Sequence, residues 1–169
     1  RFYMTGEEDI NNVVSDEEYK YVNDFFINTI ERHPGVNPFI IGENPLFIGT
    51  ENVHLTAIYN SEKIDFAKSL HSKFGGTEIT LGLKPTDEDL RTIKDNFDGK
   101  TSLVLGTFNG HLSEGQKKLI ELCMEFNGLV CHVALRNPYD LEYSDPKWTR
   151  IALYEYTERS LRALSDMFR

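Results

Sequence analysis

The sequence predicts an α/β protein, a three-layer α/β/α sandwich with a mostly parallel, doubly wound sheet and one edge strand of differing direction. Three observations predict this class. The segment 103–105 is apolar and leads through a turn at 106–110 into a helix whose apolar face is Leu119, Ile120, Cys123 and Phe126. A second, nearly continuous apolar run follows at 129–135, which is typical of a parallel strand buried on both faces. Strand and helix patterns also alternate through the rest of the chain, so we expect helices on both sides of one sheet.

Length and composition limit the classes of protein that fit. The 169 residues suit one domain, and roughly 70% of the unfolded surface can be buried at this size. The formal net charge is −9, from 27 acidic and 18 basic residues without a basic cluster, so nucleic acid is not an expected partner. No run approaches the ~18 apolar residues of a membrane span, and the first residues lack the apolar core of a secretion signal. We therefore expect a soluble chain.

The first third of the chain predicts an arm, a helix and the first core strand. Ser15 and Glu18 form a capping-box pattern, and apolar residues then recur at helical spacing up to His33, where Pro34 and Gly35 end the helix. We expect residues 1–35 to form this amino-terminal arm and helix, a linker region. Residues 36–169 are expected to form the sandwich domain with a single core. Three short apolar runs follow: Phe39–Ile41, Leu46–Ile48 and Val53–Ile58. We expect the first core strand at Leu46–Ile48.

The remaining elements follow from caps and periodicity. Ser61 is expected to cap a helix with Ile64, Ala67, Leu70 and Phe74 on its apolar face, before an alternating strand at 77–83. Thr86 and Asp89 frame the next helix, and Gly128 is expected to end the helix before the 129–135 strand in a left-handed conformation. The weakly alternating, polar strand at 149–154 is placed at an edge of the sheet, before a last helix that Thr157 opens.

Several kinds of chemistry lack their motifs. The chain has no Gly-x-Gly-x-x-Gly turn, no phosphate loop and no Gly-x-Ser-x-Gly elbow, so a nucleotide cofactor and a nucleophilic serine are not expected. Ser113 is interpreted as a helix cap, with Gln116 completing the capping box. The five histidines have no metal-binding spacing, and the two cysteines, Cys123 and Cys131, sit among apolar residues as free thiols do. We expect no metal, no cofactor and no disulfide.

Candidate contact residues follow two of the buried strands. Asn109 and His111 come after the strand at 101–106, and Arg136 and Asp140 come after the strand at 129–135. Ligands bind at the carboxyl ends of the strands in open parallel sheets, so we expect these four side chains at one end of the sheet, in contact with substrate or with another domain. His132 is interpreted as a core histidine. Arg136 is expected to hold its loop through a bidentate pair with Asp140.

The chain resembles the carboxyl-terminal α/β sandwich domain of family 3 glycoside hydrolases, especially the β-N-acetylglucosaminidase (β-hexosaminidase) branch. The resemblance extends from about Leu46 to Phe168, and three segments carry it: LVLGTFNGHLSEGQKKLI at 103–120, VALRNPYDL at 133–141 and LYEYTERSLRAL at 153–164. Its most specific parts are the turn that begins at His111 and the loop that begins at Arg136. Before Gly42 the sequence departs from the family's usual linker.

The resemblance implies a partner domain. In that family the sandwich follows a (β/α)8 barrel, which holds the nucleophilic aspartate and, in this branch, a histidine acid/base. The barrel is not in this chain, so the resemblance implies no catalytic residue here and an inactive isolated chain. In the β-glucosidase branch the sandwich supplies a glutamate, and no motif selects one of the loop glutamates of this chain: Glu43, Glu51 and Glu142.

Two functions of different classes therefore remain open from the sequence. The first is the non-catalytic domain of a β-N-acetylglucosaminidase-like hydrolase that acts on aminosugar glycosides, such as cell-wall fragments, with the barrel as its partner. The second is a stand-alone α/β module that binds a small ligand or a protein.

Overall fold

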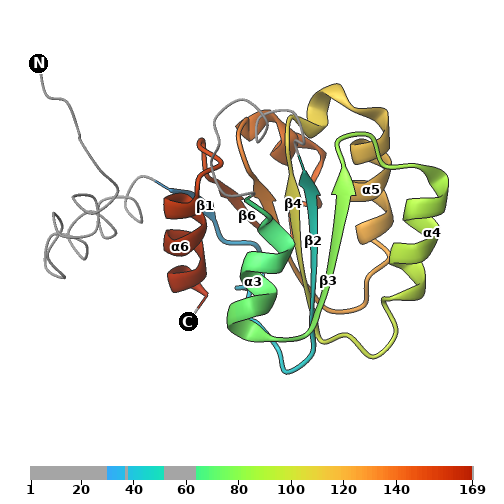
Figure 1. The fold of residues 1–169 in the computed structure, drawn as a ribbon, viewed down its shortest axis with the longest axis horizontal. Coiled ribbons are helices and arrows are strands. Elements are labelled where there is room, and N and C mark those ends of the chain that lie inside the picture. Colours follow the sequence, from blue (N-terminus) through green and yellow to red (C-terminus); the bar gives the residue numbers. More distant parts are fainter. Residues whose placement is uncertain (1–29, 37, 52–63, 169) are drawn as a thin grey trace, which may run out of the picture.

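The fold is a six-stranded sheet between two layers of helices (Figure 1). The computed structural model describes residues 30–36, 38–51 and 64–168. With η marking a 3₁₀ helix, the elements in chain order are β1 (Glu31–His33), β2 (Pro45–Glu51), α3 (Phe66–Phe74), β3 (Thr77–Gly82), α4 (Asp87–Asp95), β4 (Ser102–Thr107), η1 (Gly110–Leu112), α5 (Glu114–Cys123), β5 (Leu129–Ala134), η2 (Pro138–Tyr143), β6 (Thr149–Ala152) and α6 (Glu158–Met167).

The strands lie in the order β1-β6-β5-β4-β2-β3. All neighbouring strands are parallel except β1, which runs antiparallel to β6 and forms one edge. The predicted fold class, a mostly parallel sheet with one edge strand of differing direction, is confirmed. The predicted strands at 46–48, 77–83, 101–106 and 129–135 correspond to β2, β3, β4 and β5.

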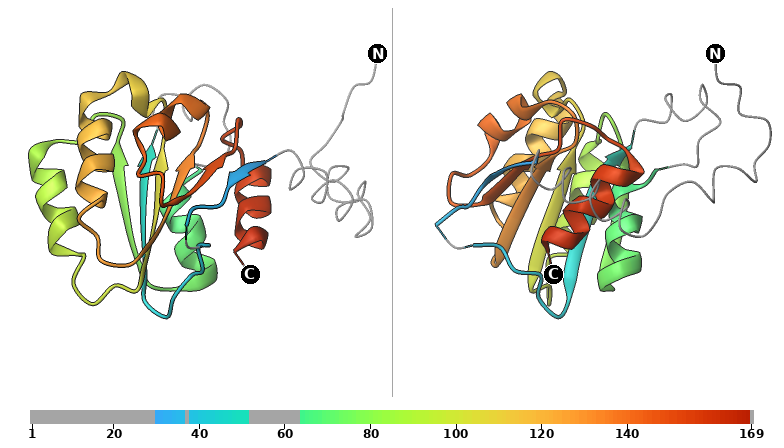
Figure 2. Two further views of the ribbon diagram at one scale, coloured as in Figure 1. Left: turned by 180° about the vertical axis from the view of Figure 1, so that it is seen from behind. Right: turned by 90° about the vertical axis from the view of Figure 1, so that its left-hand side faces the viewer.

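The two faces of the sheet carry separate hydrophobic clusters. Helices α3 and α6 cover one face of the sheet, and α4 and α5 cover the other (Figure 2). Phe47 and Val104 pack in one cluster with α3 and α6, whereas Leu46 and Leu105 pack in the other with α4 and α5. Neighbouring residues of one strand point to opposite faces, so β2 and β4 must be apolar at nearly every position. This accounts for the continuous apolar runs in the sequence.

Capping side chains start the helices where the sequence predicts them. Thr86 and Asp89 form a complete capping box at α4, and Thr157 caps α6. Asp65 caps α3; the predicted cap Ser61 lies outside the described residues, as do the predicted run 53–58 and most of the predicted amino-terminal helix. None of the described helices, of which the longest have ten residues, has the length and hydropathy of a membrane span.

Three predictions of local structure are wrong. Residues 31–33, expected to end a helix, form β1, because their backbone pairs with β6. The strand at 149–152 is not at the edge: β6 lies between β5 and β1, and Thr149 is buried. Gly128 does not end α5 in a left-handed conformation, because α5 ends at Cys123 and i→i−3 hydrogen bonds up to Phe126 tighten its last turn.

Candidate functional site

Polar side chains gather at the carboxyl ends of β4 and β5. Asn109 and His111 follow β4, Arg136 and Asp140 follow β5, and the two strands are parallel neighbours. The structure therefore places all four predicted residues at one end of the sheet, where its parallel strands end. This end is called the carboxyl edge, or simply the edge, below. The chain leaves β2 toward β3 on one side and leaves β4 toward β5 on the other, so its connections diverge between β2 and β4. Ligands of doubly wound proteins bind at such a point.

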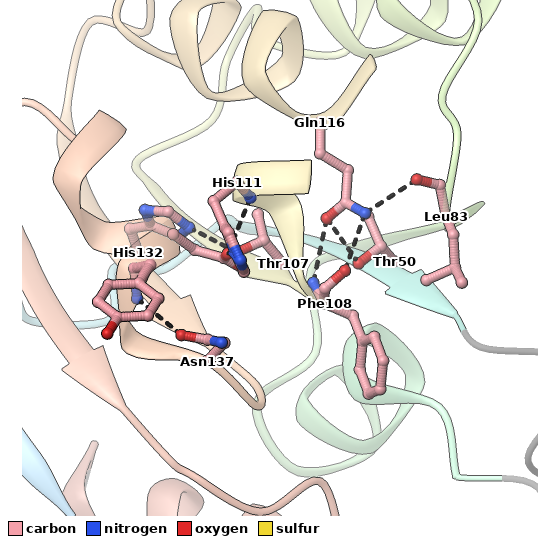
Figure 3. Close-up of polar contacts among 10 residues, drawn as sticks. Thr50, Leu83, Thr107, Phe108, His111, Gln116, His132 and Asn137 are labelled. Atoms are coloured by element: carbon pink, nitrogen blue, oxygen red, sulfur yellow. Dashed lines mark hydrogen bonds and ion pairs between the residues drawn. The ribbon is translucent and has the colours of Figure 1, made fainter. Parts of the chain in front are cut away.

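A buried carboxylate organises the polar contacts around Thr107 and His111, two residues labelled in Figure 3. Asp140 is fully buried, and its Oδ1 accepts the backbone N–H of His111 at 2.9 Å and lies 2.7 Å from the imidazole Nδ1 of the same residue. Its Oδ2 accepts the hydroxyl of Thr107 at 2.7 Å. The His111 side chain is 17% exposed, and Tyr139 lies edge-on to its ring at a centroid distance of 5.7 Å.

The hydrogen bonds behind Thr107 have a defined direction. Thr107 gives its only hydroxyl hydrogen to the carboxylate, so it accepts from Nε2 of His132, 2.9 Å away. A neutral His132 then has a free lone pair on Nδ1, which accepts the hydroxyl of Ser144 at 2.5 Å. Each donor in this series of hydrogen bonds points toward Asp140. The imidazole Nε2 of His111 makes none of these hydrogen bonds, so it is the group left to meet a ligand.

The pKa values agree with this direction. Burial raises the pKa of Asp140, but the hydrogen bonds from the backbone and imidazole of His111, from the Gly110 backbone and from Thr107 outweigh it, and the net pKa lies below the usual value. Burial lowers the pKa of His132 to about 4, with Arg150 adding to the effect and Asp140 opposing it. At neutral pH the site thus contains an ionised Asp140 and a neutral His132.

Gln116 connects the ends of three strands. Its Nε2 donates to the carbonyl of Leu83 at 2.9 Å and to that of Phe108 at 3.0 Å, while its Oε1 accepts the N–H of Phe108 at 3.0 Å and the hydroxyl of Thr50 at 3.3 Å. All four hydrogen-bonding positions of the amide are used. Ser113 does cap α5, but the predicted capping box is wrong because the Gln116 side chain turns inward to β2, β3 and β4.

The predicted pair between Arg136 and Asp140 does not form. Asp140 is buried against η1, whereas Arg136 is exposed and its guanidinium carbon lies 5.8 Å from the centre of the Phe108 ring. Asn109 adopts a left-handed conformation with φ 50°, which asparagine tolerates better than most residues. Asn109 and Arg136 line one pocket of about 250 Å³, beside the cluster that contains His111 and Asp140.

Other candidate groups are placed as follows. In the described part of the chain, no group of three or more His, Cys, Asp or Glu side chains has an arrangement that could hold a metal ion. Glu43 precedes β2 at the amino end of the sheet, Glu51 ends β2, and Glu142 is exposed on η2. Both cysteines are buried free thiols, with pKa values raised by burial. The described residues offer one imidazole–carboxylate pair at this end of the sheet, and none of them places a second acid or base in contact with the pair.

Solved structures show which larger proteins contain this fold. A family 3 β-N-acetylglucosaminidase from Paenibacillus sp. str. FPU-7 matches with a TM-score of 0.75 and 22% identity, over 99% of this chain and 33% of the enzyme. The β-glucosidase of Listeria innocua, in complex with isofagomine, matches with a TM-score of 0.70 and 14% identity, over 94% of this chain and 26% of the enzyme. A fungal multi-domain family 3 β-N-acetylglucosaminidase matches with a TM-score of 0.70 and 17% identity, over 97% of this chain and 19% of the enzyme.

The matched region is one domain of each larger glycoside hydrolase. This chain spans about a fifth to a third of the length of these three enzymes. At these identities the likeness establishes a shared fold. No protein-family model matches the sequence, and no curated protein matches it.

Proposed function

We propose that this chain is the non-catalytic sandwich domain of a larger family 3 glycoside hydrolase, in which it packs on a (β/α)8 barrel and helps to form the sugar cleft. The observation that carries the proposal is the extent of the match. Practically the whole chain, 99%, superposes on one third of the Paenibacillus enzyme with a TM-score of 0.75. Such coverage is expected if the chain is one domain of an enzyme with this architecture.

The β-N-acetylglucosaminidase type is the favoured branch. The sequence identities are 11–22% to β-N-acetylglucosaminidases and 13–15% to the Listeria β-glucosidase, so the choice of branch rests on particular segments of the sequence. The segments at 103–120 and 133–141, which resemble that branch, contain η1 and the start of η2. We therefore propose an aminosugar glycoside as the substrate of the complete enzyme.

The chemistry of the edge supports an auxiliary role. Retaining glycosidases need a nucleophile and a separate acid/base that flank the scissile bond, and in most families these are two carboxyl groups ~5 Å apart. Among the described residues, the carboxylate in contact with His111 is Asp140, whose two oxygens are both occupied and which is fully buried. Asp140 cannot reach a sugar, so the chain alone should not hydrolyse glycosides.

The same edge has the features of a contact surface. Leu112 on η1 is 78% exposed and Tyr139 on η2 is 58% exposed, and both flank His111. Large exposed apolar side chains beside a polar group are common where a second domain or a ligand packs. We propose that this edge faces the barrel.

The proposal is tested by assaying two proteins side by side. The 169-residue chain and the complete protein encoded by its gene are incubated with p-nitrophenyl N-acetyl-β-D-glucosaminide and with p-nitrophenyl β-D-glucoside. The complete protein should hydrolyse the glucosaminide in preference to the glucoside, and the chain alone should hydrolyse neither. A gene without the about 250 further residues that a barrel needs would refute the proposal and favour an independent binding module.

A further inference from the structure

A small pocket lies beside the His111–Asp140 cluster and is separate from it. It has a volume of about 250 Å³ and is formed where β3, β4 and β5 end. Six of the residues that line it decide its chemistry: Lys84, Phe108, Asn109, Leu112, Gln116 and Arg136. Pockets for drug-sized ligands start at about 300 Å³, so this one suits a single small molecule.

The charge of the pocket is opposite to that of the chain. The chain carries 27 acidic and 18 basic residues, yet the described residues that line the pocket include Lys84 and Arg136 and no acidic side chain. In the described part of the chain, neither cation takes part in an ion pair, and the guanidinium group of Arg136 lies over the Phe108 ring. Both positive charges are therefore available to a ligand.

The floor of the pocket supplies shape instead of free hydrogen bonds. Gln116 is buried, and its amide is saturated by Leu83, Phe108 and Thr50. The groups that remain for recognition are Lys84, Arg136 and the Asn109 side chain, with the exposed Leu112 as an apolar rim. This combination matches a ligand with one negative charge, polar substituents and an apolar surface on its body.

We propose that this pocket binds a small carboxylate-bearing ligand, with a sugar acid as the expected class. The planar fork of an arginine matches the two oxygens of a carboxylate, and a lysine adds a second positive charge. Arginine and lysine also bind phosphate, but many phosphate sites add the backbone N–H groups of a glycine-rich loop, which the sequence lacks. The choice of a sugar rests on the proposed function, whereas the negative charge of the ligand follows from the lining alone.

Calorimetric titration of the 169-residue chain tests the proposal with three probes: methyl β-D-glucuronide, the neutral methyl β-D-glucoside and inorganic phosphate. The glucuronide should bind saturably and more weakly as salt is raised, while the glucoside should bind at least about tenfold more weakly. Lys84→Gln and Arg136→Gln should each weaken glucuronide binding about tenfold, because each removes a charge-assisted hydrogen bond. NMR titration should shift the amide signals of Asn109 and Leu112.

The control variant is Lys94→Gln, which removes an exposed lysine of α4 that pairs with Glu125 away from the pocket. It should bind the glucuronide with the affinity of the unmodified chain. All three variants should have the same melting temperature as the unmodified chain. The proposal would be overturned if the glucuronide showed no saturable binding, or if the glucoside bound as tightly as the glucuronide. It would also be overturned if phosphate bound more tightly than the glucuronide, or if Arg136→Gln left the affinity for the glucuronide unchanged. Because the test uses the isolated chain and no hydrolysis, failure here leaves the proposed glycosidase role to its own assay.

Discussion

The imidazole Nδ1 of His111 lies 2.7 Å from Oδ1 of Asp140, and the same oxygen accepts the backbone N–H of His111 at 2.9 Å. One carboxylate, 29 residues further along the chain, thus holds both the ring and the backbone of the turn after β4. Because Asp140 is buried, this pair connects η1 to η2 in a place that water does not reach. The geometry of the whole edge depends on it.

Asp140→Asn should therefore destabilise the chain strongly. The amide of asparagine would present hydrogens to groups that already donate, so we expect a loss of about 3 kcal/mol in the free energy of unfolding. His111→Ala should cost about 1–2 kcal/mol because other donors to Asp140 remain. Urea unfolding of the two single variants and the double variant measures their coupling, which should be at least about 0.5 kcal/mol.

The matched control for this cycle is Arg136→Ala combined with Asp140→Asn. Arg136 contacts the Phe108 ring and not the carboxylate, so the effects of these two changes should add within about 0.5 kcal/mol. Strong coupling of Arg136 with Asp140, or additivity of His111 with Asp140, would show that the partner of the carboxylate has been assigned incorrectly.

Gln116→Leu should cost about 2–4 kcal/mol, because it leaves the N–H and carbonyl of Phe108 without their partner in a buried place. It also removes one of the two donors to the Leu83 carbonyl, which keeps the Ser113 hydroxyl. Denaturant unfolding followed by circular dichroism measures the loss. Glu121→Gln, at an exposed position of the same helix, is the control and should stay within about 0.5 kcal/mol. A small effect at Gln116 would mean that the three strand ends are held together by other contacts.

His132 should make the chain less stable in mild acid. Its pKa is about 4 in the folded chain and near 6.5 when unfolded, so between these values the unfolded chain binds a proton that the folded chain does not. Stability should thus fall as the pH drops from 6.5 toward 4, by up to about 3 kcal/mol from this residue. Urea unfolding of His132→Gln should show a shallower loss over this range. Parallel pH profiles for the two proteins would contradict a neutral buried His132.

Gly110→Ala should destabilise η1. A Cβ there would lie 3.2 Å from Oε1 of Gln116, 3.2 Å from Cβ of Thr107 and 3.3 Å from Oδ2 of Asp140. We expect a loss of about 1–3 kcal/mol from overpacking, because these contacts lie in two saturated hydrogen-bond clusters. Thermal unfolding checks this, with Gly82→Ala as the control, since a Cβ at Gly82 would meet nothing within 4 Å. Equal melting temperatures would indicate that the two clusters yield easily.

Local signals predicted most of the fold. The capping residues Thr86 and Thr157 and the apolar runs of β4 and β5 act within a few neighbouring residues, so the sequence pattern alone locates these elements. The strand at 31–33 could not be found in this way, because its conformation depends on pairing with β6 more than a hundred residues later. Tertiary pairing overrides local helical periodicity in such cases.

The position of the four candidate residues was predicted, but the pairing among them was not. The topology of a parallel sheet brings Asn109, His111, Arg136 and Asp140 to one edge. Which of them pair depends on the path of η2, which buries Asp140 against η1 and leaves Arg136 outside. Thr107 gave no signal in the sequence, since a threonine at the end of a strand is common. Gln116 was interpreted as part of a capping box, because its inward hydrogen bonds depend on the positions of three strand ends.

The most direct test of the account uses His111→Ala in the complete protein encoded by the gene. If the edge faces the sugar cleft, this change should lower kcat/KM for p-nitrophenyl N-acetyl-β-D-glucosaminide at least about tenfold, through loss of the contact made by the imidazole Nε2. Lys94→Ala, on the outer face of α4, should leave kcat/KM unchanged, and the assay should run well below the melting temperatures of both variants. An unchanged kcat/KM in His111→Ala would contradict the account.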